Sequence, residues 1–192
     1  MTPETTRILM IDHARGFLPL FRSHAIPDHV NAAVAVAKTA HAYGVPLTVT
    51  HGKDADGPGP IFEPLRAELR EEEIVRREGT FDALASPAVR SAVAGAENLV
   101  LTGLMTEGCV LQTALSAVRL GHRVHVVEDA VAAETELSHR AAMTRMAMAG
   151  VIPTTWLSLA SEFQRGWDNL ATVAAYTALI RDHAPILGAG LP

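Results

Sequence analysis

The sequence predicts an α/β fold of three layers, in which helices cover both faces of a six-stranded, mainly parallel sheet. Short apolar runs rich in β-branched residues recur along the chain, and segments with a helical period lie between them. Strands that alternate with helices form βαβ units, and these wind right-handed into a parallel sheet. The expected strand order is 3-2-1-4-5-6, which is common in doubly wound folds.

Six short runs are candidate strands, and they share a high content of apolar and β-branched residues. The third run is charged, which favours a place toward the edge of the sheet. The runs are Ile8–Asp12, Pro46–Thr50, Glu73–Arg77, Leu99–Gly103, Arg123–Glu128 and Val151–Leu157.

The segments between these runs carry helical signals. Ser86 and Pro87 form an N-cap followed by proline at the first helical position. Apolar residues recur at helical spacing in two sets, which are Val30, Val34 and Ala37, and Leu111, Leu115 and Val118. Further helices are expected over Pro64–Arg70, Glu136–Ala149 and Trp167–His183.

Length and composition indicate one folded domain over residues 1–192, because the chain is 48% apolar and no linker interrupts it. The formal net charge is -5 and the basic residues are scattered, so nucleic acid is not an expected partner. No apolar run approaches the roughly 18 residues that a membrane span requires. The N-terminus also lacks a signal-peptide pattern, so a cytoplasmic protein without membrane contact is expected.

Polar residues follow three of the predicted strands. Asp12 closes the first strand, Arg77 closes the third, and Cys109 follows the fourth at the start of a helix. In a parallel α/β sheet, ligands bind beyond the carboxyl ends of the strands, where the strand order reverses. The first and fourth strands are neighbours at that point, so Asp12 and Cys109 are expected to face one another.

Cys109 is the only cysteine, which fits a reducing compartment. A turn that contains Gly108 brings it to the first turn of a helix, whose positive end favours a thiolate. We therefore expect the thiol pKa to lie below its ordinary value of about 8.5. Free N–H groups at the helix start can also hold a developing oxyanion. The alternative is that a lone buried cysteine serves as a small hydrophobic residue.

Asp12 and Arg77 also have two interpretations each. An aspartate at a strand end commonly caps the following turn, and an arginine is commonly solvated or ion-paired. Within reach of a thiol, Asp12 becomes a proton acceptor, and Arg77 would lower the thiol pKa and bind an anionic oxygen. The candidates for the wall of a small-molecule substrate pocket, chosen by strand-end position, are His13, Phe17, His51 and Trp156.

Three other ligand-binding patterns are incomplete. Gly103 and Gly108 have P-loop spacing, but the Lys and Ser/Thr that would hold a phosphate are missing. No G-x-G-x-x-G follows the first strand. His122 and His125 lie three apart on a predicted strand and point to opposite faces, which is not a metal-ligand spacing. No cofactor and no metal are therefore expected.

The chain contains four segments in a characteristic order: Ile8–Asp12, the Arg77 segment that continues into Phe81–Leu84, Leu101–Val110, and Val126–Ala130. Together they resemble the isochorismatase-like cysteine hydrolases over nearly the whole chain. Thr155–Trp167 resembles the YcaC-like branch of that family in particular.

The resemblance implies a catalytic triad of Asp12, Arg77 and Cys109, with Arg77 where the family has lysine. Cys109 would attack a carbonyl to form an acyl enzyme, Asp12 would accept the proton, and ammonia or another small leaving group would depart. The resemblance also implies a cis peptide between Leu104 and Met105, which would direct the N–H groups of Met105 and Cys109 to the oxyanion. Relatives are usually homo-oligomers, so self-association is expected.

Two functions are expected from these residues. The first is a metal-independent cysteine hydrolase that cleaves a small amide, carbamoyl or related C–N substrate through a covalent Cys109 intermediate. Nicotinamidase activity is disfavoured, because only His51 remains of the metal ligands that those relatives carry after the second strand. The alternative is a redox-responsive or ligand-binding protein with little turnover, because arginine cannot release a proton as lysine does.

Overall fold

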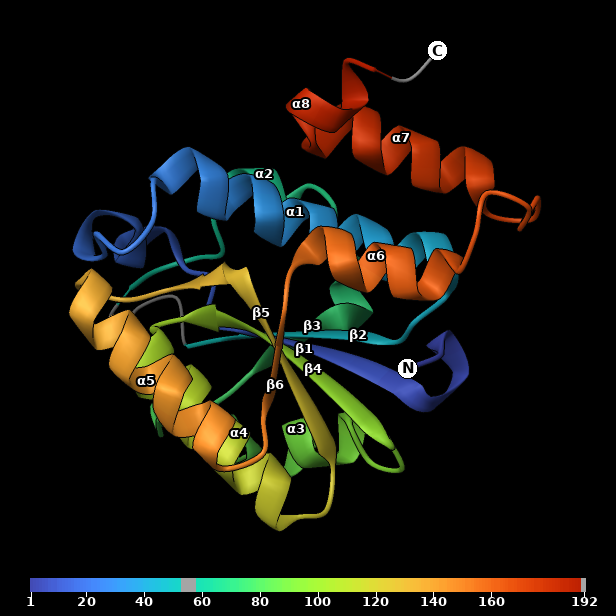
Figure 1. The fold of residues 1–192 in the computed structure, drawn as a ribbon. Helices are drawn as coiled ribbons and strands as arrows, with labels where there is room; N and C mark the ends of the chain where they lie inside the picture. The colour runs from blue at the N-terminus through green and yellow to red at the C-terminus, as the bar shows by residue number, and fades with distance from the viewer. Residues whose placement is uncertain (53–57, 191–192) are drawn as a thin grey trace.

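The computed structural model describes residues 1–52 and 58–190. They form one six-stranded sheet in the order β3-β2-β1-β4-β5-β6, and every pairing between its strands is parallel (Figure 1). The predicted fold class and strand order are confirmed. The strands are β1 (Thr6–Ile11), β2 (Leu47–His51), β3 (Ile74–Arg76), β4 (Asn98–Leu104), β5 (Arg123–Ala132) and β6 (Ile152–Thr154).

Helices cover both faces of the sheet, as Figure 1 shows. One layer contains α1 (Ile26–Tyr43), α2 (Glu63–Arg66), α6 (Trp156–Gln164) and α7 (Val173–His183). The other contains α3 (Pro87–Ala92), α4 (Leu111–Arg119) and α5 (Glu136–Met148). The short helix α8 (Pro185–Gly188) follows α7 near the C-terminus.

The alternation of side chains along the strands divides the core in two. Ile8 and Met10 of β1 pack in the cluster that includes α1, α6 and α7. Leu9 and Ile11 pack in the cluster that includes α3, α4 and α5. Because successive side chains of a strand point to opposite faces, a strand buried on both faces is apolar throughout. The continuous apolar run at Ile8–Ile11 is therefore explained by the central position of β1.

The third strand and the helix before it are shorter than predicted. β3 spans only Ile74–Arg76, because a single helical turn, η3 (Glu71–Glu73), precedes it. The Glu73 carboxylate closes that turn by accepting a hydrogen bond from the backbone N–H of Arg70 at 2.8 Å. The helix predicted over Pro64–Arg70 is the one-turn α2. The place of β3 at the sheet edge agrees with its charge.

The strand predicted over Val151–Leu157 ends at Thr154, and the helix α6 was not predicted. Thr155 ends the strand because its side-chain oxygen accepts a hydrogen bond from the backbone N–H of Ser158 at 3.2 Å. This is an N-cap contact, and it starts a helix.

The last long helix starts later than predicted, at Val173 rather than Trp167. The residues before it form a loop that the Gln164 side chain holds. Its amide donates hydrogen bonds to the carbonyl oxygens of Gly166 at 2.8 Å and Asn169 at 3.1 Å. These carbonyl groups of the loop are therefore hydrogen-bonded although the loop is not helical.

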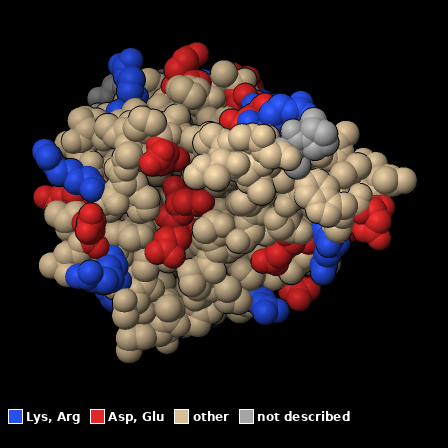
Figure 2. Space-filling model, turned by 45° about the horizontal axis from the view of Figure 1, so that its top comes forward, with Lys and Arg blue, Asp and Glu red and all other residues tan. Residues whose placement is uncertain are grey.

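Charged side chains are interspersed on the surface. On the face drawn in Figure 2, Lys and Arg lie in small groups that alternate with Asp and Glu and with uncharged surface. None of the described helices is long and apolar enough to cross a membrane.

Gly103 marks the closest approach of β4 to β1. Its φ angle is +142°, and a Cβ atom there would lie 2.2 Å from the backbone oxygen of Ile11. Ile11 is its partner in the β1–β4 pairing and directly precedes Asp12. Only glycine fits this position, because a side chain would separate the two central strands next to the strand ends.

Substitution of Gly103 by Ala should destabilise the protein by about 3 kcal/mol or more, because it combines backbone strain with a clash in the sheet. Gly121→Ala is the control, since Gly121 has a φ of +89° but nothing within 4 Å of an added Cβ. Its cost should be about 1 kcal/mol. Denaturant unfolding of both variants measures the difference. Equal costs would show that the close approach of the strands is not what requires Gly103.

Candidate active site

Three strand ends bring Asp12, Arg77 and Cys109 to one cavity. Asp12 follows β1, Arg77 follows β3, and Cys109 lies in the helical turn Thr106–Val110 between β4 and α4. All three line a cavity of about 400 Å³, and the predicted wall residue Phe17 lines it too. The other described lining residues are Gly52, Pro58, Glu78, Gly79, Thr80 and Phe81.

Asp12 and Arg77 form a buried ion pair. The Arg77 Nε atom donates to Asp12 Oδ1 at 3.2 Å, and an Nη atom donates to Oδ2. Thr50 of β2 lies between the two and donates its hydroxyl to Asp12 Oδ1 at 2.9 Å. Asp12 itself has a left-handed backbone with a φ of 52°, which is uncommon outside glycine. The carboxylate is therefore held from two neighbouring strands.

Cys109 lies in an irregular turn. Gly108, directly before it, has non-helical angles of φ -104° and ψ -107°. The backbone oxygen of Met105 accepts hydrogen bonds from the N–H groups of Gly108 at 3.0 Å and Val110 at 3.3 Å. The peptide bond between Leu104 and Met105 is cis, at the position that the family resemblance implied. This turn places the thiol at the end of the cavity beside Asp12.

The surroundings of Cys109 raise its thiol pKa to about 11. Burial is the main cause, because it disfavours the thiolate, and the negative charge of Asp12 adds to it. Arg77 acts in the opposite direction but is outweighed. The expectation of a lowered pKa was therefore wrong, because Cys109 is only 9% exposed and the negative charge of Asp12 acts on its thiol.

His13 does not line the cavity of Cys109. It is fully buried on the face of the sheet that α1 covers, where its Nε2 atom lies 2.8 Å from the hydroxyl of Thr102. Its ring packs against His29 and Phe62, with centroid distances of 5.4 and 5.6 Å. Burial lowers its pKa well below the ordinary range. The prediction that His13 is a pocket wall was wrong, because this side chain leaves the strand end on the face opposite to Asp12.

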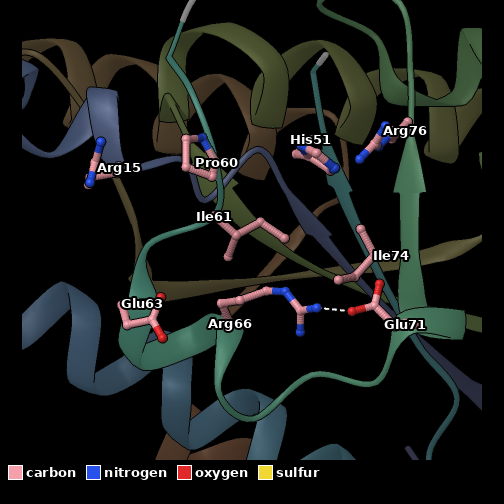
Figure 3. A pocket seen from close by; sticks show the side chains of 9 residues that line it. All are labelled: Arg15, His51, Pro60, Ile61, Glu63, Arg66, Glu71, Ile74 and Arg76. Carbon is pink, nitrogen blue, oxygen red and sulfur yellow. Dashed lines mark hydrogen bonds and ion pairs between the residues drawn. The ribbon is translucent and has the colours of Figure 1, made fainter. Parts of the chain in front are cut away.

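His51 lines a different cavity, of about 490 Å³. Figure 3 shows it beside Arg76 at the ends of β2 and β3, with the Arg66–Glu71 ion pair farther along the cavity. Neighbouring residues of a strand point to opposite faces, so Thr50 faces Asp12 and His51 faces away. The same alternation separates Arg76 from Arg77. His51 therefore lines a pocket, but not the cavity that contains Cys109.

Trp156 belongs to the core. It is the first residue of α6, and its backbone N–H donates to Asp129 Oδ1 at 3.0 Å. Its ring makes an edge contact with His183 of α7, at a centroid distance of 6.1 Å. It packs in the cluster of α1, α6 and α7, whereas Cys109 packs in the cluster on the other face. The sheet lies between them, so the prediction of Trp156 as a pocket residue was wrong.

Two sets of residues in the site were not identified from the sequence. Thr50 bridges the ion pair. The sequence pattern that could have identified it is a hydroxyl residue alternating with apolar residues in a strand, because a buried hydroxyl needs a hydrogen-bond partner. Thr106 begins the turn of Cys109, and its hydroxyl lies 3.1 Å from Nδ1 of His139 on α5. No sequence pattern connects residues 33 positions apart, so this contact follows only from the tertiary structure.

Within residues 1–52 and 58–190, no three His, Cys, Asp or Glu side chains are grouped so as to hold a metal ion. Among the described residues that line the cavity, the ionisable groups are the thiol, the two carboxylates of Asp12 and Glu78, and the Arg77 guanidinium. The site therefore offers a nucleophile, a proton acceptor and a fixed positive charge.

Comparison with known proteins finds close similarity over most of the chain. "Probable hydrolase YcaC" of Escherichia coli K12 is 29% identical over 180 residues, covering 93% of this chain and 86% of that protein. Its crystal structure, described as an octameric hydrolase of unknown specificity, has a TM-score of 0.92 and covers 97% of this chain and 92% of that one.

A structure of YcaC from Pseudomonas aeruginosa, described with hexane-2,5-diol and covalent acrylamide, is 28% identical with a TM-score of 0.92. The two chains are covered over 98% and 94% of their lengths. The profile of the isochorismatase domain matches residues 6–158, which contain Asp12, Arg77 and Cys109. The chain therefore belongs to the isochorismatase family.

Proposed function

We propose that this protein is a cysteine hydrolase of small carboxamides or related C–N substrates. The observation that carries the proposal is the convergence of Cys109, Asp12 and Arg77 at one end of a cavity of about 400 Å³. Cavities of this size suit small molecules. The covalent acrylamide in the Pseudomonas aeruginosa structure supports the nucleophilic part of the proposal, because thiols add to the double bond of acrylamide.

In the proposed reaction, the Cys109 sulfur attacks the amide carbon while Asp12 takes the thiol proton. The tetrahedral intermediate collapses, the C–N bond breaks, and the amide nitrogen takes that proton and leaves as ammonia. Water then attacks the thioester, Asp12 takes a proton from it, and the C–S bond breaks. Asp12 gives that proton to the departing sulfur, so the thiol is regenerated and a carboxylic acid is released. We assign the Met105 and Cys109 N–H groups as the oxyanion donors of both steps.

The raised thiol pKa supports this role for Asp12. A thiol with a pKa of about 11 is largely protonated at neutral pH, so a resting thiolate does not supply the nucleophile. Proton removal must then accompany the attack. Arg77 has a fixed charge and serves to hold Asp12 in place. The same pKa disfavours a redox-responsive role, because the thiolate is the form that is oxidised.

The homo-oligomer remains a proposal. It is supported by the octameric description of the Escherichia coli relative, and by apolar side chains at the C-terminal end of this chain that are exposed in the single chain.

Alkylation of Cys109 should follow an apparent pKa near 11 rather than the ordinary value of about 8.5. The rate should rise with pH as the thiol ionises, and the profile should still climb well above pH 9. Mass spectrometry of the single-cysteine chain after timed exposure to iodoacetamide measures it. An inflection at or below the ordinary value would mean that the thiol is activated at rest, and that proton removal by Asp12 is not required.

Cys109→Ser and Cys109→Ala should both abolish hydrolysis across a panel of small amides followed by ammonia release. The folded state should persist, because Cys109 fills a small buried volume beside the cavity; circular dichroism and thermal unfolding check it. Wild-type protein mixed with a turned-over amide should also gain the mass of the acyl group on the Cys109 peptide. Ammonia release by the alanine variant would exclude the covalent route.

Asp12→Asn should lower the acylation rate by about 10²- to 10⁴-fold, which is the usual loss of a general acid–base group. The same change should lower the alkylation pKa of Cys109, because the Asp12 charge is one of the causes that raise it. Asp182→Asn is the control. Asp182 is on α7, where its Oδ2 atom lies 3.8 Å from Nζ of Lys38 on α1, and it does not line the cavity of Cys109. If Asp12→Asn lowers the alkylation pKa of Cys109 but leaves the turnover rate unchanged, Asp12 is not the proton acceptor.

A further inference from the structure

The cavity of Cys109 has buried polar lining residues and less buried apolar ones. Asp12, Arg77 and Cys109 are buried, whereas Phe17, Pro58 and Phe81 are partly or largely exposed, as is the loop at residues 78–80. Phe81 is 68% exposed, which is unusual for a large aromatic side chain. An exposed ring at the mouth of a cavity is placed to cover the apolar part of a bound molecule.

Arg77 has little capacity left to bind a substrate. A guanidinium has five N–H donors. Two of them bind the Asp12 carboxylate, and one Nη atom donates to the backbone oxygens of Glu78, at 3.1 Å, and Thr80. The thiol of Cys109 also lies within hydrogen-bonding reach. The guanidinium is thus occupied by the protein itself, and it connects Asp12 to the loop that carries Phe81.

The charges that line the cavity disfavour an anion. Arg77 is the only cation among the described lining residues, and its charge is balanced by Asp12. Glu78 adds a second carboxylate to the wall. A substrate carboxylate would enter next to these groups, and none of the described lining residues offers it an unpaired cation. A buried unpaired charge is costly.

We infer that the Cys109 cavity selects uncharged carboxamides whose acyl part is a short apolar or aromatic group seated between Phe17 and Phe81, and that it rejects acids. The identification of these molecules as substrates rests on the proposed function, whereas the selection of molecules by the cavity does not. The cavity, the occupied guanidinium and the two phenyl rings act on any molecule that approaches the thiol. Selection can therefore be measured without turnover.

Alkylation by a matched pair of reagents tests the charge selection. Iodoacetamide and iodoacetate differ by one charge, and Cys109 is the only thiol. The rate ratio of the two at Cys109, divided by the ratio for 2-mercaptoethanol at the same pH, should favour iodoacetamide at least tenfold. The thiolate fraction cancels in this ratio. A corrected ratio near one would overturn the rejection of anions.

A second pair of reagents tests the aromatic seat. We expect 2-bromo-2-phenylacetamide to label Cys109 faster, relative to 2-bromopropanamide, than it labels 2-mercaptoethanol. Phe81→Ala should reduce this preference severalfold, because the phenyl group loses its contact. Leu120→Ala, an exposed apolar residue at the opposite end of α4, should leave the preference unchanged. An unchanged preference in Phe81→Ala would overturn the seat.

The two proposals fail in different ways. If no amide is hydrolysed but labelling keeps both preferences, the hydrolase proposal fails and the selection stands. If amides are hydrolysed, benzamide should have a higher kcat/KM than phthalamate, which carries the same ring with an added carboxylate. Equal values would overturn the selection while the hydrolase proposal stands.

Discussion

The buried ion pair between Asp12 and Arg77 is the contact on which the rest of the candidate site depends. The Arg77 side chain reaches from the edge strand β3 across β2 to the end of β1, and Thr50 bridges the gap. The two side chains are only 3% and 11% exposed. Removing one member of such a pair leaves an uncompensated buried charge and costs roughly 3–5 kcal/mol. Three strand ends and the loop at residues 78–80 are held in register by this contact.

The same contact determines the state of the nucleophile. Asp12 opposes ionisation of Cys109, and Arg77 only partly offsets it, because most of its charge is already balanced. Burial adds to the effect of the carboxylate. The site therefore holds a neutral thiol beside a carboxylate rather than a preformed thiolate. The chain belongs to the isochorismatase family, and its site contains the kinds of group that acyl transfer to a thiol uses.

The pleat of the sheet separates two cavities at one edge of the molecule. Thr50 and Arg77 point to the face of Cys109, whereas His51 and Arg76 point to the cavity drawn in Figure 3. A shift of one residue along the strand thus moves a side chain from one cavity to the other. Strand-end position alone identifies the edge of the sheet where ligands bind, but not the face.

The sequence by itself determined the three-layer α/β fold, the strand order and the meeting of Asp12, Arg77 and Cys109, because apolar periodicity and the geometry of parallel sheets are local and general rules. Only the tertiary structure decided which side chains join them. His13 and Trp156 lie across the sheet, and the direction of the Cys109 pKa depends on burial and on charges from distant segments. Both features depend on residues that are close in space but distant in the sequence, so the spacing of residues along the chain does not predict them.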